Sequence, residues 1–153
     1  MEMERKALQV SAIKDGTVID HIPAERLFDV INILGLFNSQ EMITFGTNLD
    51  SKQLGKKGII KVANRFFQDQ EINKIALIAP NAKLNTIKNF EVVDKRVVEI
   101  PKEIVNIVKC FNPKCITNNE KIKTRFSVVS EKPIALKCFY CEKITNEDEI
   151  VIK

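Results

Sequence analysis

The chain has 153 residues, of which 44% are hydrophobic and 29% are charged, and its formal net charge at pH 7 is +4. This composition excludes fibrous and disordered proteins and predicts one ordinary domain or two small ones. No apolar run reaches the roughly 18 to 20 residues that a membrane span needs, and the first residues include acidic side chains and no apolar core of signal-peptide length. We therefore expect a cytoplasmic protein with no membrane partner.

The first 35 residues predict extended chain followed by a helix. Two extended runs flank the turn dipeptide Asp15-Gly16 within residues 7–22. Pro23 then opens a segment that ends at Gly35, and these residue types are typical of the first turn and the end of a helix. The apolar side chains of this segment have the spacing of one helical face. They are Leu27, Phe28, Ile31 and Leu34.

The following residues complete a mixed domain. Residues 41–49 and 56–64 alternate as strands, residues 69–80 form a second helical segment that stops near Pro80, and residues 83–93 form a fourth strand or a hairpin. The resulting order is βαββαβ, which is the ferredoxin-like arrangement. We therefore predict an α+β fold in which the first and third strands lie side by side.

The third strand carries a candidate binding surface. Alternation places Lys57, Ile59 and Lys61 on one face of this strand, within reach of Asp20 or His21 on the first strand. Lysines, one imidazole and a carboxylate that accepts from ribose hydroxyls suit a nucleotide, although no P-loop and no G-x-G-x-x-G motif occurs. The same pattern also fits solvated edge lysines, so both interpretations stay open at this point.

Catalysis is not expected from this domain. His21 is the only histidine, so a catalytic triad or a histidine metal site would depend on one imidazole. Consecutive residues of a strand point to opposite faces, so the side chains of Asp20 and His21 are not expected to meet.

All four cysteines lie in two short runs near the end of the chain: Cys110 and Cys115 in "KCFNPKC", and Cys138 and Cys141 in "KCFYC". Because the cytosol is reducing, C-x4-C followed by C-x2-C favours two metal knuckles that hold one zinc ion, with an iron–sulfur cluster, a redox pair and disulfides as alternatives. Four sulfurs leave no open coordination position, so the zinc would be structural. We expect a small antiparallel β domain, with strand alternation over residues 122–128.

The charge of the zinc-bound chain is lower than the formal value. Four thiolates and one divalent zinc bring the net charge to about +2. Lysines flank both knuckles, and they either offset the negative zinc–thiolate centre or mark a zinc-ribbon nucleic-acid-binding protein. The pI of about 8.9 and the lack of aromatic residues along a basic stripe speak against nucleic acid as a partner.

Four motifs together resemble one known family. "LQVSAIKDGTVIDHIPA", "LGKKGIIKVAN", "IALIAPNAKLNTIKNFEVV" and the cysteine pairs, the second within "IALKCFYCEK", resemble the regulatory chain of aspartate carbamoyltransferase in order and spacing. The resemblance implies a non-catalytic subunit with an allosteric nucleotide-binding domain over residues 1–100 and a zinc-binding domain over residues 101–153. It also implies a regulatory-chain homodimer, contact with a catalytic chain through the zinc domain, inhibition by CTP and UTP, and activation by ATP.

The resemblance also implies which residues contact the nucleotide. At the matching positions these are Val10, Ala12, Ile13, Val18, Asp20, His21, Lys57, Lys61, Ile87, Val92 and Lys95. Ser11, Ala7 and Phe90 depart from the glutamate, lysine and tyrosine that the family often has there, which bears on effector choice. The segment from Arg96 to Cys110 has no glycine and one proline, so we expect a stiff connector between the domains. A small-molecule sensor serving another enzyme stays an alternative.

Overall fold

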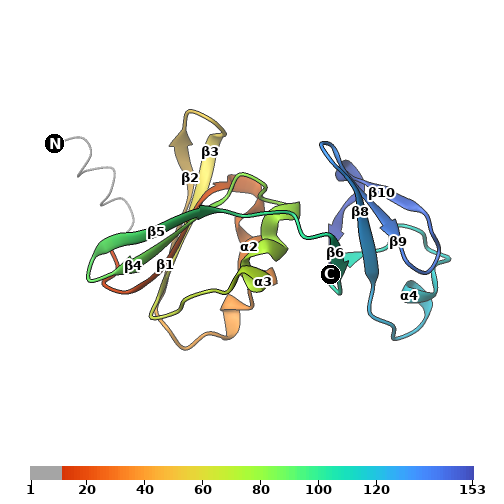
Figure 1. Cartoon of the computed structure of the whole chain (residues 1–153), viewed down its shortest axis with the longest axis horizontal. Coiled ribbons are helices and arrows are strands. Elements are labelled where there is room, and N and C mark those ends of the chain that lie inside the picture. Colours follow the sequence, from red (N-terminus) through yellow and green to blue (C-terminus); the bar gives the residue numbers. More distant parts are fainter. Residues whose placement is uncertain (1–11) are drawn as a thin grey trace. The chain divides into compact units, whose positions relative to one another are not determined.

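The computed structural model describes residues 12–153. The chain divides into two compact units, Met1–Glu99 and Ile100–Lys153 (Figure 1). Within the described residues, no helix has both the length and the apolar character needed to cross a bilayer. The mixed α+β class and the mainly antiparallel strands agree with the predicted fold class.

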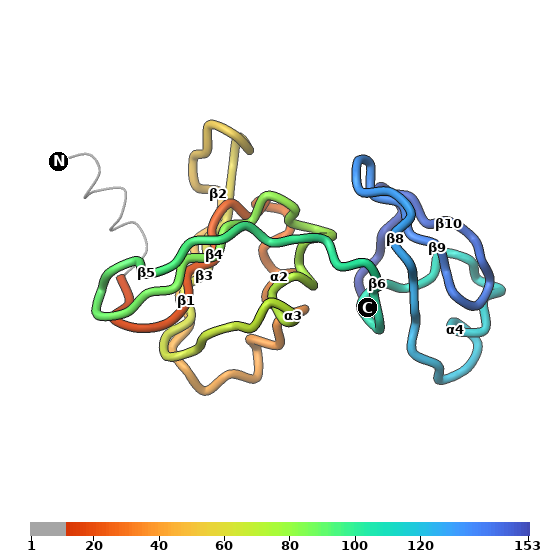
Figure 2. Tube along the Cα trace, viewed as in Figure 1, coloured from red at the N-terminus to blue at the C-terminus, as the bar shows by residue number. Residues whose placement is uncertain are grey.

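The first unit is an antiparallel sheet with helices on one side (Figure 1). Its strands follow the order β2-β3-β1-β4-β5, so the predicted neighbours β1 and β3 are paired, and β5 adds an edge strand to the βαββαβ pattern. Figure 2 shows that the chain reverses direction between β4 and β5. Of the two alternatives predicted for residues 83–93, the structure therefore has the hairpin. The elements are β1 (Gly16–Pro23), η1 (Ala24–Arg26), α2 (Leu27–Ile33), η2 (Leu36–Asn38), β2 (Ile43–Ser51), β3 (Gly55–Ala63), α3 (Asp69–Ile72), η3 (Asn73–Leu77), β4 (Lys83–Lys88) and β5 (Glu91–Val97).

The core of this unit lies between the sheet and its helices. Ile19, Ile60 and Leu84 are at most 1% exposed and alternate with residues of the opposite face, as expected for strands with one covered side. Helix α2 packs closely on β3, because a Cβ atom at Gly58 would lie 2.8 Å from Leu27 Cδ1. Among the described elements, no helix covers the other face of the sheet, which we refer to as the open face.

The helical segments differ in detail from the predicted ones. Gly35 has a φ of 67° and ends the first helical segment, as predicted. Phe28, however, is 57% exposed and meets Phe45 edge to face, whereas Val30 is buried. The second helix is shorter than predicted, because one α-helical turn of α3 continues as the 3-10 helix η3.

The second unit is built from short antiparallel strands. Its four-stranded sheet has the order β10-β9-β8-β6, and β11 pairs with β7 in a separate ribbon. Strand β8 begins at Arg125, so the predicted alternation from Ile122 starts three residues too early. The elements are β6 (Glu103–Val105), β7 (Val108–Lys109), α4 (Ile116–Asn119), β8 (Arg125–Glu131), β9 (Ile134–Cys138), β10 (Ile144–Asn146), η4 (Glu147–Glu149) and β11 (Val151–Ile152).

Most residues of the connector predicted between Arg96 and Cys110 belong to one of the two units. Arg96 belongs to β5, and the backbone N–H of Glu99 donates to Asn73 Oδ1 in the first unit at 3.0 Å. On the other side, the carbonyl of Lys102 accepts from the Val128 N–H in the second unit at 3.0 Å. Only Ile100 and Pro101 separate these two anchored positions.

Candidate functional sites

The four cysteines come together in the second unit. Cys110 follows β7, Cys115 precedes α4, Cys138 ends β9, and Cys141 lies in the turn after it. Their Sγ atoms all lie within 4.8 Å of one another, and all four thiols are free. Residues up to 31 positions apart in the sequence thus form one cluster, as the knuckle spacing predicted.

The sulfur spacing fits a tetrahedral metal ion. Metal–sulfur bonds of about 2.3 Å in a tetrahedron place neighbouring sulfurs about 3.8 Å apart. The Sγ atoms of Cys110 and Cys141 are 3.6 Å apart, and those of Cys115 and Cys138 are 3.8 Å apart. These separations are far longer than a disulfide bond of about 2.05 Å, so the geometry supports a four-thiolate metal centre.

Hydrogen bonds within the two knuckles hold the thiols in place. The backbone N–H of Cys138 donates to the carbonyl of Lys143 at 3.0 Å, and Glu142, with a φ of 63°, donates back to the carbonyl of Cys138. In the first knuckle, the side-chain amide of Asn118 donates to the carbonyls of Cys110 and Asn112, both at 2.8 Å. The turns are therefore fixed by the surrounding chain and do not depend on the sulfurs alone.

The thiols differ in how readily they ionise without a metal. Burial raises the pKa of Cys110 and also that of Cys138. Burial acts in the same direction on Cys141, but hydrogen bonds from the Lys143 backbone and the Asn112 side chain outweigh it and lower the pKa of Cys141 to about 7. Cys141 therefore ionises before Cys110 and Cys138, and a bound cation displaces the protons of the ligating thiols because only thiolates are effective ligands.

A second candidate site lies on the open face of the first unit. Ile13, Val18 and Ile87 form a buried apolar cluster there, against which Ile59 packs. One row of side chains crosses the sheet beside this cluster, since the strand register pairs Lys61 with Val18, Val18 with Asn85, and Asn85 with Lys95. Directly paired residues of antiparallel strands project on the same face. An apolar patch is thus flanked by lysines from β3 and β5.

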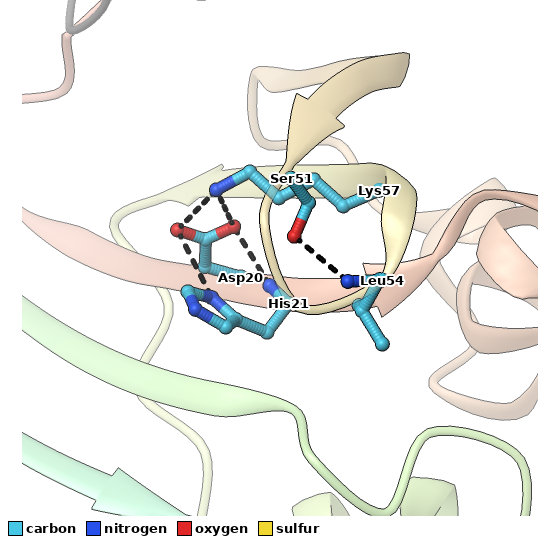
Figure 3. Close-up of polar contacts among 5 residues, drawn as sticks. All are labelled: Asp20, His21, Ser51, Leu54 and Lys57. Carbon is cyan, nitrogen blue, oxygen red and sulfur yellow. Dashed lines mark hydrogen bonds and ion pairs between the residues drawn. The ribbon is translucent and has the colours of Figure 1, made fainter.

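Asp20, His21 and Lys57 form a polar cluster next to this row (Figure 3). Lys57 Nζ lies 2.9 Å from Asp20 Oδ1 and 3.1 Å from Oδ2, and the backbone N–H of His21 donates to Oδ1 at 2.7 Å. His21 Nδ1 lies 3.5 Å from Asp20 Oδ2. It is buried, and it makes no hydrogen bond within the described part of the chain.

The expectation that Asp20 and His21 point to opposite faces is therefore wrong. The β1–β3 register shifts between Ile19 and Ile22, and His21 has a φ of 61° at this bulge. A bulge interrupts the alternation of side chains along a strand, so both residues can turn to the same side. The imidazole and the carboxylate consequently belong to one polar cluster.

Lys61 is the most buried charged group of the open face. It is 8% exposed, and its burial lowers the pKa of its ammonium group, with the nearby Asp20 carboxylate opposing this shift. An anionic or carbonyl-bearing ligand at this position would add a charge-assisted contact to this ammonium group.

The structure brings most of the described sequence-predicted contact residues to the open face. Val10, Ala7 and Ser11 lie outside the described residues, Ala12 is exposed, and Phe90 is 64% exposed in the turn between β4 and β5. Those on or beside the open face are Ile13, Val18, Asp20, His21, Lys57, Lys61, Ile87, Val92 and Lys95.

Asn85 is a further candidate for nucleotide contact that the sequence alone did not predict. It lies between Val18 and Lys95 in the strand register, and its side-chain amide can both donate and accept. Asn85 lies two residues before Ile87 on β4, so strand alternation places both side chains on the same face of the sheet. Only the pairing of β4 with β1 shows that this face is the one that carries Val18.

Comparisons with known proteins agree on one family. A family model described as the aspartate carbamoyltransferase regulatory chain, allosteric domain, matches residues 8–99. A second model, described as the metal binding domain of the same regulatory chain, matches residues 102–151.

Curated relatives extend this similarity over nearly the full length. A protein of Bacteroides fragilis named aspartate carbamoyltransferase regulatory chain is 55% identical over 152 residues, covering 99% of both chains. One of the same name from Phocaeicola vulgatus is 55% identical, covering 98% of this chain and 97% of the relative. A third, from Thermococcus sibiricus, is 52% identical and covers 97% of each.

Proposed function

The chain belongs to the family of aspartate carbamoyltransferase regulatory chains, and from that premise we propose that its open face binds nucleotide effectors while its four thiolates hold a structural zinc ion. Membership confirms the prediction of a regulatory, non-catalytic subunit with an allosteric and a metal-binding domain. The proposed functional division follows the expected ranges, residues 1–100 for effectors and residues 101–153 for zinc and the catalytic chain.

The observation that carries the effector proposal is the combination of groups on the open face. The Ile13–Val18–Ile87 cluster offers an apolar wall for a base. Asp20 accepts from ribose hydroxyls, Lys61 reaches the base or sugar, and the lysines that flank them neutralise phosphates. By family resemblance, we propose CTP and UTP as inhibitors and ATP as the activator.

The metal proposal rests on the donor set. Four clustered thiolates, two pairs of which have tetrahedral spacing, are typical of structural zinc, and they leave no position for an activated water. Zinc supplies the bonds that hold the knuckles of Cys110 and Cys138 together, while the chain's own hydrogen bonds orient the sulfurs. A four-cysteine metal site also suits the expected cytoplasmic location, where thiols stay reduced.

Protein partners are proposed for both units. The second unit exposes Phe139 and Tyr140 beside the metal knuckle, and we propose that this surface contributes to binding a catalytic chain. In the first unit, the edge strand β2 pairs on one side only within the described residues, and the exposed Phe28–Phe45 pair lies next to it. An unpaired edge beside exposed aromatic rings suits a regulatory-chain homodimer.

The experiment that tests the effector proposal is a pair of titrations on the intact chain. Calorimetry with CTP and ATP should give saturable binding, and a DNA or RNA oligonucleotide should give none at physiological salt. Strong oligonucleotide binding that weakens steeply with salt, together with no nucleotide binding, would instead favour the nucleic-acid alternative. Co-purification with an unrelated enzyme would favour the alternative of a sensor for another enzyme.

A further inference from the structure

We propose that Lys83 binds the phosphates beyond the first one of a nucleoside triphosphate and thereby makes the effector site prefer triphosphates over monophosphates. The inference rests on the nucleotide function proposed for the open face. Neither the sequence pattern nor the family resemblance pointed to this residue, which begins β4.

The strand register places Lys83 on the open face. In the β1–β4 pairing, Leu84 lies opposite Ile19, and both are at most 1% exposed on the side covered by helices. The next pair along is Asp20 with Lys83, and alternation turns this pair to the other side of the sheet. Directly opposite side chains have Cβ atoms about 4.5 to 5.5 Å apart, so Lys83 is the immediate cross-strand neighbour of Asp20.

Lys83 also has a basic neighbour on its other side. In the β4–β5 pairing it lies opposite Val97, and Lys95 is two residues away from Val97 on the same strand face. Such diagonal neighbours are about 7 to 8 Å apart, within the reach of two long side chains that hold one polyphosphate. Lys83 and Lys95 therefore form a two-lysine edge of the site.

The charge of Lys83 is available, whereas that of Lys57 is not. Lys57 contacts both oxygens of Asp20, so its charge is largely compensated within the chain. Between residues 12 and 153, Lys83 has no ion pair and no side-chain hydrogen bond, and its side chain is exposed. An anion that reaches this row would gain a new cationic contact without breaking an existing ion pair.

The position of Lys83 along the sheet indicates which phosphates it meets. The apolar cluster extends from Ile87, which pairs with Gly16, to Val18, and Lys83 pairs with Asp20, two residues beyond Val18 and four beyond Gly16. Four residues of a strand span about 13 Å. A base on the apolar cluster and a sugar near Asp20 and Lys61 would leave the outer phosphates, rather than the first, near Lys83.

The test compares CTP with CMP by calorimetry on the intact chain and three variants. Lys83→Ala should lower the affinity for CTP by about tenfold, since a charge-assisted contact is lost, and should change the affinity for CMP less than about twofold. Lys83→Arg should restore most of the CTP affinity. Lys88→Ala, an exposed lysine at the other end of the same strand, is the matched control and should behave as wild type.

Wild-type CTP affinity in Lys83→Ala, equal losses for CTP and CMP, or an equal loss in Lys88→Ala would each overturn the role of Lys83. A wild-type chain that binds neither ligand would instead defeat the nucleotide function itself. The two failures are therefore distinguishable by the wild-type titration alone.

Discussion

Single residues decide the chemistry of the open face, and His21 is the clearest example. Its left-handed backbone conformation turns the imidazole toward Asp20, where it joins Lys57 in one polar cluster. Non-glycine residues in this conformation cost free energy and often occur at functional positions. The bulge at His21 thus belongs to the architecture of the proposed effector site.

At Lys61 and Lys95, removal of the ammonium group should weaken nucleotide binding. Lys61→Ala should cost about 1.5 to 3 kcal/mol of CTP binding energy, because a buried charge-assisted contact is lost. Lys95→Ala should cost less, since water screens this exposed side chain. Calorimetry provides the measurement, with Lys74→Ala on the exposed side of η3 as the control. Wild-type affinity in both site variants would rule out the open face as the effector site.

The lowered pKa of Lys61 predicts a pH dependence of binding. Its ammonium group loses its proton at a lower pH than an ordinary lysine, because burial disfavours the charged form. Nearby phosphates favour the charged form, so nucleotide binding should raise this pKa again and take up a fraction of a proton at alkaline pH. Calorimetry in two buffers of different ionisation enthalpy measures the uptake. Identical uptake in Lys61→Ala would contradict the assignment to this group.

At the scale of elements, local patterns predicted most of the first unit. Alternation located β1, β3 and β4, and the residue types at Pro23 and Gly35 located the ends of the first helical segment. The pairing of β1 with β3 followed from the ferredoxin-like order. In the second unit, the cysteine spacing was enough to predict one four-sulfur cluster, because each pair had to lie on a tight turn.

What the sequence could not predict depends on contacts between distant segments. The bulge at His21 arises where β1 adjusts to β3, and nothing in the local residue pattern marks it. Phe28 has helical spacing with the core residues but points out toward Phe45 of β2. Asn85 and Lys83 became candidates only through the register of β4 with β1. Each of these features requires the tertiary pairing, which periodicity along one strand does not contain.

The proposed zinc site should control the folding of the second unit as a whole. Cys138 is fully buried and pairs with Phe126, the largest fully buried side chain of this unit. Structural zinc contributes about 10 to 16 kcal/mol in small zinc-binding peptides, so Cys138→Ala should unfold the second unit and abolish capture of the catalytic chain. The first unit, which has its own core, should stay folded and bind nucleotide.

Elemental analysis and circular dichroism measure these effects. Ser127→Ala changes an exposed side chain of β8 in the same β8–β9 hairpin and serves as the control. One zinc ion per chain is expected in the wild type and in this control. A Cys138→Ala chain that keeps its zinc and captures catalytic chains normally would refute the structural role.

At the scale of the whole molecule, regulation requires a link between the two units. Glu99 is anchored in the first unit and Lys102 in the second, so only Ile100 and Pro101 lie between them. A link this short, with one proline, restricts the chain far more than a glycine-rich tether does. We therefore expect that the covalent link helps to transmit the effect of nucleotide binding.

Insertion of several glycines after Pro101 should uncouple the two units. Zinc content, nucleotide affinity and assembly should remain, whereas the coupling free energy between effector and substrate, typically about 1 to 3 kcal/mol, should fall toward zero. The measurement is the nucleotide-induced shift in substrate response of the reconstituted enzyme. A full shift in the glycine variant would exclude the short link as the route of coupling.

The most direct test of regulation through the open face is aspartate saturation of a catalytic chain reconstituted with this chain, with and without CTP or ATP. With wild-type regulatory chain, CTP should raise and ATP should lower the aspartate concentration at half saturation, and both shifts should shrink in the Lys61→Ala and Lys95→Ala double variant. Saturation curves that superimpose with and without nucleotide in the wild-type assembly, or that shift equally in the double variant, would contradict an effector site on this face.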